Sequence, residues 1–332
     1  MKRPSYPWFK ILIWLFACFQ ALSAHSISFQ NSEHLSIENL KKFMDWFTYS
    51  PHPMGSKEQV KIANDLHATL KKMNLKVSEM KFEADVPNLD SPKFGGKVAM
   101  ATLTKKVTGI NIIATKKGTD NCGIILGGHY NTKYFSQFKF VGANDGGSST
   151  VLLLELARVL QKTKGKKESY LQKCDIHFIF FDGEEAFLND WNDGLNYIGI
   201  QDNTYGSKEF VKKQVKNKNG IKFYADKKLD LVIILDMVGH KNQKLYFTKG
   251  SDSKYADTFV QLAKDIDISN FPYQIEDDHI SFAQEGISFL HIIDWKNLDE
   301  WHTSNDTKEI ISFEKIKNLG NSIKYFLMSE RK

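Results

Sequence analysis

The chain has 332 residues, of which 42% are hydrophobic and 25% are charged, as is typical of a globular protein with one large or two average domains. The formal net charge is +6, and Lys2, Arg3 and Lys10 supply half of it at the extreme N-terminus. The remaining excess is small and spread over scattered lysines, which argues against a nucleic-acid-binding protein.

The N-terminus has the pattern of an export signal. A basic region precedes an apolar stretch at residues 11–22, which is too short to cross a bilayer comfortably, and small residues precede a cut after Ser23. We therefore predict a signal peptide over residues 1–23 and one domain over residues 24–332, exported to the periplasm or the extracellular space without a membrane span in the mature chain. An uncleaved anchor, or a lipid on Cys18, is the alternative.

Beyond this segment the hydrophobic pattern alternates between the period of a strand and that of a helix. Such alternation predicts an α/β fold in which a mixed, mostly parallel central sheet is flanked by helices on both faces. Helices are predicted over residues 38–49, 56–73, 151–160, 207–216, 255–266, 279–285 and 313–328. Strands are predicted over residues 76–84, 98–104, 109–114, 123–128, 176–181, 229–235, 245–248 and 287–293.

Two cysteines follow the leader. Cys122 precedes one predicted strand and Cys174 opens another. They could pair if those strands are neighbours, or remain two buried thiols, and their spacing is not that of a metal site.

The most informative stretch is IHFIFFDGEEAFL at residues 176–188. Its apolar run indicates a strand buried on both faces, and ligands of α/β sheets bind at the carboxyl ends of such strands. Glu184 and Glu185 fall at that end. Adjacent carboxylates repel each other unless a cation holds one of them. In the simplest interpretation, one glutamate is a metal ligand and the other is a general acid/base. An isolated pair of glutamates could also belong to a solvated turn.

Other acidic and imidazole residues also follow predicted strands. His129, Asp145, Asp236 and His302 each lie at a strand end or in the loop after it. Because the ends of parallel strands converge, these residues can share one crevice. Carboxylate and imidazole groups together suit zinc, and a catalytic zinc takes three protein ligands and leaves one position open.

These residues lie in a pattern that resembles the glutaminyl-peptide cyclotransferases (glutaminyl cyclases), which are relatives of the zinc-dependent aminopeptidases. The resemblance extends over most of the chain from about residue 50, and it implies the fold of those aminopeptidases. The matching stretches are GGHYNTKYF (127–135), FVGANDGGSST (140–150), FIFFDGEEAF (178–187), TYGSKEFV (204–211), DLVIILDMVG (230–239), IEDDHISFAQEGISFLHII (275–293) and EWHTSNDT (300–307).

The resemblance implies a reaction and a set of residue roles. An N-terminal glutamine of a peptide or protein is cyclised to pyroglutamate with loss of ammonia, and N-terminal glutamate is left open as a second substrate. The protein would act as a monomer with one Zn²⁺ per chain. The implied metal ligands are Asp145, Glu185 and His302. The implied catalytic residues are Glu184, Asp236 and Asp277. The implied substrate-binding residues are Trp191, Trp301, Glu276 and Leu298, and His279 would support the site residues from behind without touching the substrate.

The sequence also departs from the family pattern. Asn131 stands where the family usually has Asp, which weakens a second metal site at His129 and favours a single zinc. An extra residue precedes Trp191, residues 198–204 look like an insertion, and Leu298 lies in a divergent stretch. The competing interpretation is an exported dizinc aminopeptidase in which His129 and Asp236 are further ligands and Glu184 activates a water.

Overall fold

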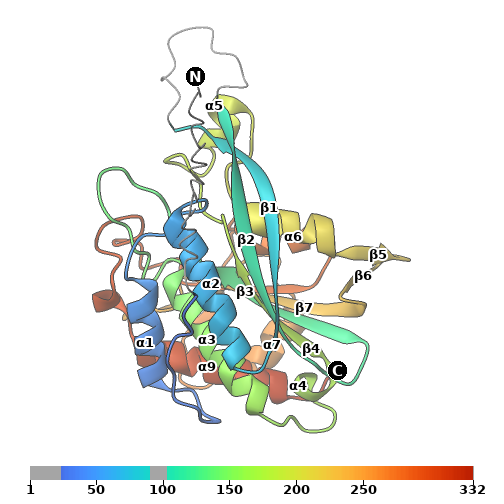
Figure 1. Cartoon of the computed structure of the whole chain (residues 1–332). Coiled ribbons are helices and arrows are strands. Elements are labelled where there is room, and N and C mark those ends of the chain that lie inside the picture. The colour runs from blue at the N-terminus through green and yellow to red at the C-terminus, as the bar shows by residue number, and fades with distance from the viewer. Residues whose placement is uncertain (1–23, 90–102, 332) are drawn as a thin grey trace, which may run out of the picture.

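The computed structural model describes residues 24–89 and 103–331. The predicted signal peptide and most of the strand predicted over residues 98–104 lie outside the described residues. Within them, one sheet has the order β1-β2-β4-β3-β7-β10-β8-β9, and a β5-β6 hairpin pairs with β7 (Figure 1). The strands are β1 (Lys76–Pro87), β2 (Thr104–Lys116), β3 (Cys122–His129), β4 (Asp175–Phe181), β5 (Lys216–Lys218), β6 (Ile221–Tyr224), β7 (Lys227–Asp236), β8 (Leu245–Phe247), β9 (Ile268–Asn270) and β10 (Phe289–Ile293).

The centre of the sheet is parallel and its flanks are antiparallel. Strand β3 pairs in parallel with β4 and β7, and β7 pairs in parallel with β10. Strands β1 and β2 extend the sheet antiparallel on one side, and β8 pairs antiparallel with β10 on the other. The mixed sheet predicted from the sequence is confirmed, and the carboxyl ends of its four central strands lie along one edge.

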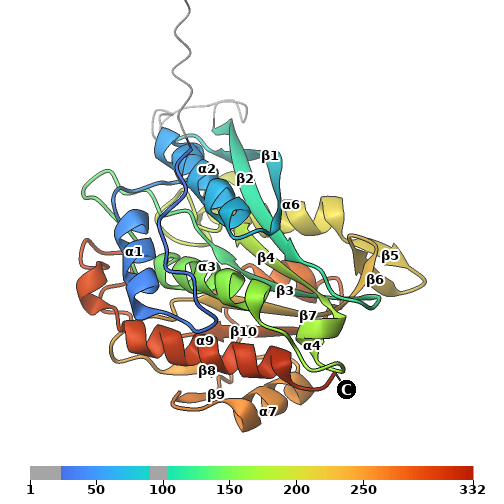
Figure 2. The same ribbon diagram turned by 60° about the horizontal axis from the view of Figure 1, so that its bottom comes forward.

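Helices cover both faces of this sheet (Figures 1 and 2). The larger layer contains α1, α2, α3, α7 and α9, and α6 and α8 cover the opposite face. The helices are α1 (Ile37–Phe47), α2 (Lys57–Lys72), α3 (Gly147–Lys162), α4 (Tyr170–Lys173), α5 (Asp193–Ile198), α6 (Tyr205–Gln214), α7 (Ser253–Leu262), α8 (His279–Ala283), the short 3₁₀ helix η2 (Lys308–Ile310) and α9 (Phe313–Met328).

Strand β4 shows why the central strands have nearly continuous apolar sequences. Phe178 and Phe180 belong to the core under α3 and α9, whereas Ile179 and Phe181 belong to the core under α6 and α8. Both faces of the strand therefore exclude water, and every residue of β4 is buried. This burial fixes the strand's position, so the glutamates that follow it are held at the edge of the sheet.

The helix boundaries agree best with the prediction where local signals are strong. The Ser56 side chain accepts a hydrogen bond from the Gln59 amide and starts α2, as its position before the helical pattern predicts. Several short elements were not predicted: the exposed β5-β6 hairpin, strand β9, helices α4 and α5 and the 3₁₀ helix η2. Each of their helices and strands is three to six residues long, which is too short to show a periodic apolar pattern. Among the described residues, no helix has the length and hydropathy needed to cross a bilayer.

Cys122 and Cys174 form a disulfide that joins the start of β3 to the residue before β4, with their Cα atoms 4.7 Å apart. The sequence left this pairing open, and the parallel β3-β4 pair places the two residues side by side. The bridge lies at the opposite end of these strands from Glu184 and Glu185.

We expect the Cys122→Ser/Cys174→Ser double variant to unfold more easily and to keep its activity. The bridge links residues 52 positions apart, and constraining the unfolded chain over such a loop stabilises a fold by about 2–4 kcal/mol. Urea denaturation of the two proteins, with and without reductant, measures the difference. Identical midpoints for the oxidised parent and the double variant would contradict a stabilising role.

Candidate metal and catalytic site

A cavity of about 470 Å³ opens where the loops after β4, β7 and β10 meet the segment before α3. Nine of the ten predicted site residues line it, although they are spread over more than 150 positions of the chain. They are Asp145, Glu184, Glu185, Trp191, Asp236, Glu276, Asp277, Trp301 and His302. The tenth, Leu298, lies instead in the apolar cluster that contains Trp295 and Trp301 behind the cavity wall.

Asp145, Glu185 and His302 form a compact group whose potential ligand atoms lie within 4.8 Å of one another. His302 Nε2 is 3.3 Å from Asp145 Oδ2 and 3.3 Å from Glu185 Oε2. Neither Glu185 oxygen, nor Asp145 Oδ2, accepts a hydrogen bond from any described residue, although all three atoms are buried. Buried carboxylate oxygens are costly without a partner, so two carboxylates and an imidazole in this arrangement fit a metal such as zinc.

The electrostatics of the group favour positive charge at its centre. Burial alone would lower the pKa of His302, but the carboxylates of Glu185 and Asp145 outweigh it and raise this pKa to about 9. Burial would raise the pKa of Asp145, and the nearby imidazoles of His129 and His302, which each face one of its carboxylate oxygens, reverse that effect and lower it. The two carboxylates therefore attract a cation at the position that His302 Nε2 faces.

Asp306 holds the Asp145 backbone, and this residue was not predicted from the sequence. Its two carboxylate oxygens accept hydrogen bonds from the Asn144 and Asp145 amides, at 2.7 and 3.0 Å. Gly146 follows with a φ of +83°, and a Cβ there would meet His129 Cε1 at 2.7 Å. Asp145 is thus fixed by a residue 161 positions away. The only sequence signal for Asp306 is its place in the EWHTSNDT stretch.

His302 is held in an uncommon conformation. Its φ is +56°, in the left-handed region that residues other than glycine rarely adopt. The imidazole stacks on Trp301 with ring centroids 3.9 Å apart. Such backbone strain persists only where the surroundings impose it, and it often marks functional positions.

Glu184 is buried beside this group, and its backbone is pinned. Its amide donates to Asn131 Oδ1 at 3.0 Å, and its carboxylate lies 3.9 Å from His129 Nδ1. Burial raises the pKa of Glu184 well above its usual range; His129 opposes this effect, and Glu185, Asp277 and Asp236 add to it. A carboxyl group whose pKa is raised in this way is suited to general acid/base work.

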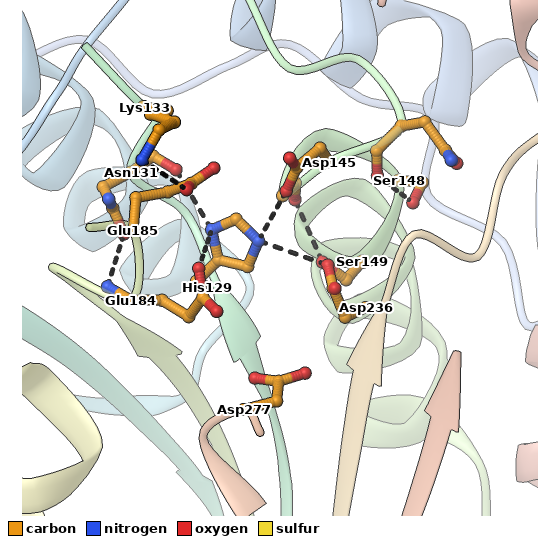
Figure 3. Close-up of polar contacts among 12 residues, drawn as sticks. His129, Asn131, Lys133, Asp145, Ser148, Ser149, Glu184, Glu185, Asp236 and Asp277 are labelled. Atoms are coloured by element: carbon orange, nitrogen blue, oxygen red, sulfur yellow. Dashed lines mark hydrogen bonds and ion pairs between the residues drawn. The ribbon is translucent and has the colours of Figure 1, made fainter. Parts of the chain in front are cut away.

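His129 lies between several carboxylates (Figure 3). Its Nε2 is 3.2 Å from Asp145 Oδ1 and 3.2 Å from Asp236 Oδ1, and these three residues form a second group that could hold a metal. Its Nδ1 faces the backbone carbonyl of Asn131 at 3.1 Å. The ring is therefore oriented by the Asn131 backbone, while the Asn131 side chain holds Glu184. The presence of Asn at position 131 therefore argues less strongly against a second metal at His129 than the sequence suggested.

Asp236 and Asp277 face the same cavity and differ in electrostatic environment. Burial raises the pKa of Asp236 to about 6, against the effect of His129. Burial would also raise the pKa of Asp277, but His291, whose Nε2 is 2.7 Å from Asp277 Oδ2, outweighs it and lowers this pKa. His279 stacks on His291 at 4.0 Å, so it supports Asp277 through that ring.

Aromatic residues form much of the outer cavity wall. Trp191 and Trp301 were predicted there, whereas Phe271, Tyr273 and Trp295 were not. Trp295 packs edge-on against Trp301 with centroids 5.7 Å apart. Glu276 stands at the rim, where its Oε1 accepts a hydrogen bond from Gln201 Nε2 at 2.6 Å.

Comparisons with known proteins identify the family of the chain. Residues 111–327 match the model of Peptidase family M28. A curated relative, the glutaminyl-peptide cyclotransferase of Drosophila melanogaster, is 29% identical over 246 residues, which cover 66% of this chain and 64% of that protein. The chain spans between 59% and 65% of the length of the curated relatives that it matches.

Solved structures share the fold. The glutaminyl cyclase of Tannerella forsythia has a TM-score of 0.71 at 21% identity, covering 90% of this chain and 100% of that one. The aminopeptidase of Aneurinibacillus sp. strain AM-1 has a TM-score of 0.67 at 18% identity, covering 89% and 93%. The resemblance to glutaminyl cyclases and their aminopeptidase relatives is thereby confirmed, and the chain belongs to Peptidase family M28.

Proposed function

We propose that this protein is a zinc-dependent glutaminyl-peptide cyclotransferase, an acyltransferase that converts the N-terminal glutamine of peptides or proteins to pyroglutamate. One observation carries the proposal: the group of Asp145, Glu185 and His302 lies beside Glu184, whose pKa is raised by burial, in one cavity with an aromatic wall. The curated relatives that are named glutaminyl-peptide cyclotransferases support this substrate class.

The chemistry divides between the metal and the side chains around it. A zinc ion held by Asp145, Glu185 and His302 would supply Lewis-acid polarisation of the glutamine γ-carboxamide. Glu184 receives a proton from the substrate α-amine as the amine nitrogen attacks the carboxamide carbon. The same carboxyl group then delivers that proton to the departing ammonia. One C–N bond forms, one breaks, and no water is consumed.

The remaining cavity residues bind and shield the substrate. Asp236 and Asp277 offer carboxylate oxygens that accept hydrogen bonds from the α-amine and orient it. Trp191 and Trp301 cover the reacting end, with Glu276 at the rim. Excluding water matters because attack by water on the same carbon would yield glutamate instead of the ring.

The cellular setting is proposed on the N-terminal pattern alone. A signal peptide over residues 1–23 would place the domain outside the cytosol, where the Cys122–Cys174 bridge is stable. Peptides or proteins with an N-terminal glutamine would be its partners there, and the protein would act as a monomer.

A dizinc aminopeptidase is the second candidate, and one observation favours it. His129, Asp145 and Asp236 form a further group suited to a metal, and Asp145 is common to both groups. In that case Glu184 would take a proton from an attacking water. Zinc analysis separates the candidates, since the cyclase proposal expects one zinc per chain and the aminopeptidase two.

Metal removal tests the proposal. Protein dialysed against a strong chelator should release no ammonia from a peptide that begins with glutamine, and adding about one equivalent of zinc should restore the release. Full activity in a sample whose zinc content is close to zero would contradict the role given to Asp145, Glu185 and His302.

A further inference from the structure

Lys133 is buried to an extent unusual for a lysine. Only 2% of its surface is exposed, and it is the only buried lysine among residues 24–89 and 103–331. Its Nζ donates to the carbonyl oxygens of Ala186 and Leu188, at 2.6 and 2.9 Å. The same ammonium lies 4.0 Å from Glu185 Oε2 (Figure 3). A lysine is rarely buried unless its charge has a structural or functional purpose.

Asp202 holds the same segment from its other side. Its carboxylate accepts hydrogen bonds from the Phe187 and Leu188 amides, at 3.1 and 2.8 Å. The Tyr205 hydroxyl donates to Asp202 Oδ1 at 2.7 Å and fixes the carboxylate in turn. The Lys133 ammonium therefore binds the carbonyls of Ala186 and Leu188, and the Asp202 carboxylate binds the amides of Phe187 and Leu188.

This segment needs external support. Residues 185–188 belong to no helix or strand, so they make no regular backbone hydrogen bonds of their own. Glu185 stands at the start of the segment, and Trp191 follows a few residues after its end. The direction of the Glu185 side chain thus depends on the contacts that Lys133 and Asp202 provide.

We propose that Lys133 and Asp202 form a clamp on residues 185–188 that positions Glu185 for the metal and thereby sets the zinc affinity of the site. Both are positioning residues, because they act through Glu185 without touching the substrate. Asp202 comes from residues 198–204, the stretch that looks like an insertion, so this stretch has a structural purpose at the site. The inference rests on the proposed function in one respect, the role of Glu185 as a ligand.

For Lys133→Met, the loss of charge and the loss of hydrogen bonds predict opposite changes in zinc affinity. A lysine ammonium close to Glu185 repels a metal cation, so removing its charge alone would tighten zinc binding. Loss of the two hydrogen bonds would release the segment and weaken zinc binding, and losing a residue that orients a ligand typically costs about 10- to 100-fold in metal affinity. The clamp predicts that the second effect prevails.

The experiment measures zinc dissociation constants by competition with a chromophoric chelator in four proteins: the parent, Lys133→Met, Asp202→Asn and Lys116→Met. The clamp predicts affinities about 10- to 100-fold weaker in the first two variants, even though one loses a positive charge and the other a negative one. Lys116→Met is the matched control, because Lys116 Nζ also donates to a backbone carbonyl, that of Leu171, and Lys116 pairs with Ile176 at the opposite end of β4 from Glu185. Its affinity should stay within about twofold of the parent.

Each outcome is decisive. Parent-like or tighter zinc binding by a folded Lys133→Met protein would overturn the clamp. If that variant does not fold, unchanged affinity in Asp202→Asn overturns it instead. Absence of zinc binding by the parent protein would refute the proposed function, and it is therefore distinguishable from failure of the clamp.

Discussion

Glu184→Gln is expected to lower kcat by about 10²- to 10⁴-fold while the zinc content stays at the parent level. The amide is nearly isosteric with the carboxyl group but cannot accept the proton of the attacking amine. Asp145, Glu185 and His302 remain in place, because the Asn131 side chain holds Glu184 through its backbone amide, which the substitution leaves intact.

Turnover of a glutamine-initiated peptide, with zinc measured on the same sample, checks this result. Glu300→Gln is the control, since Glu300 lies in the same loop as His302 but does not line the cavity. A Glu184→Gln protein with near-normal kcat would remove Glu184 from the mechanism.

His302→Ala is expected to lose its zinc. His302 supplies the imidazole of the three-residue group, and the two remaining carboxylates would hold the ion with an affinity at least about 100-fold weaker, the upper end of what loss of a supporting residue costs. The fold should survive, because His302 lies in a loop at the cavity and contributes no part of the sheet or the helix layers.

Metal analysis after dialysis measures the loss, and circular dichroism confirms the fold. His67→Ala is a suitable control: His67 is a partly exposed histidine that pairs with Glu79 at 2.6 Å, away from the cavity. Full zinc occupancy in His302→Ala would show that the ligand assignment is wrong.

The central strands and the acidic residues at their ends could be predicted from the sequence for a physical reason. Strand β4 is buried on both faces, so most of its residues are apolar, and the change to Asp182 and the glutamates marks the end of the strand. The helix predicted over residues 313–328 coincides with α9. Its N-cap Ser312, whose side chain accepts a hydrogen bond from the Lys315 amide, and its periodic apolar face are both local signals.

Contacts between distant segments could not be predicted in the same way. Backbone atoms of other loops are held by Asp306, Lys133 and Asp202. Because backbone amides and carbonyls are present in nearly every residue type, the residue type of the partner does not indicate such a hydrogen bond. Asn131 illustrates the limit. Its residue type suggested a change at His129, whereas the structure shows its side chain on the Glu184 amide.

The cavity wall shows a related limit. Trp191 and Trp301 were identified by resemblance, but Phe271 and Tyr273 lie in a stretch with no recognisable pattern and reach the cavity through the loop between β9 and α8. Aromatic residues are common in cores as well, so only their placement in the fold reveals which of them face the substrate.

The central claim is that an N-terminal glutamine is cyclised, and the most direct test is the mass of the product. The purified protein is incubated with a short peptide that begins with glutamine, with and without a zinc chelator, and the peptide is followed by mass spectrometry. The account predicts an intact peptide that has lost one ammonia, with the reaction stopped by the chelator and restored by zinc. A peptide shortened by one residue, together with free glutamine, would contradict it and identify an aminopeptidase.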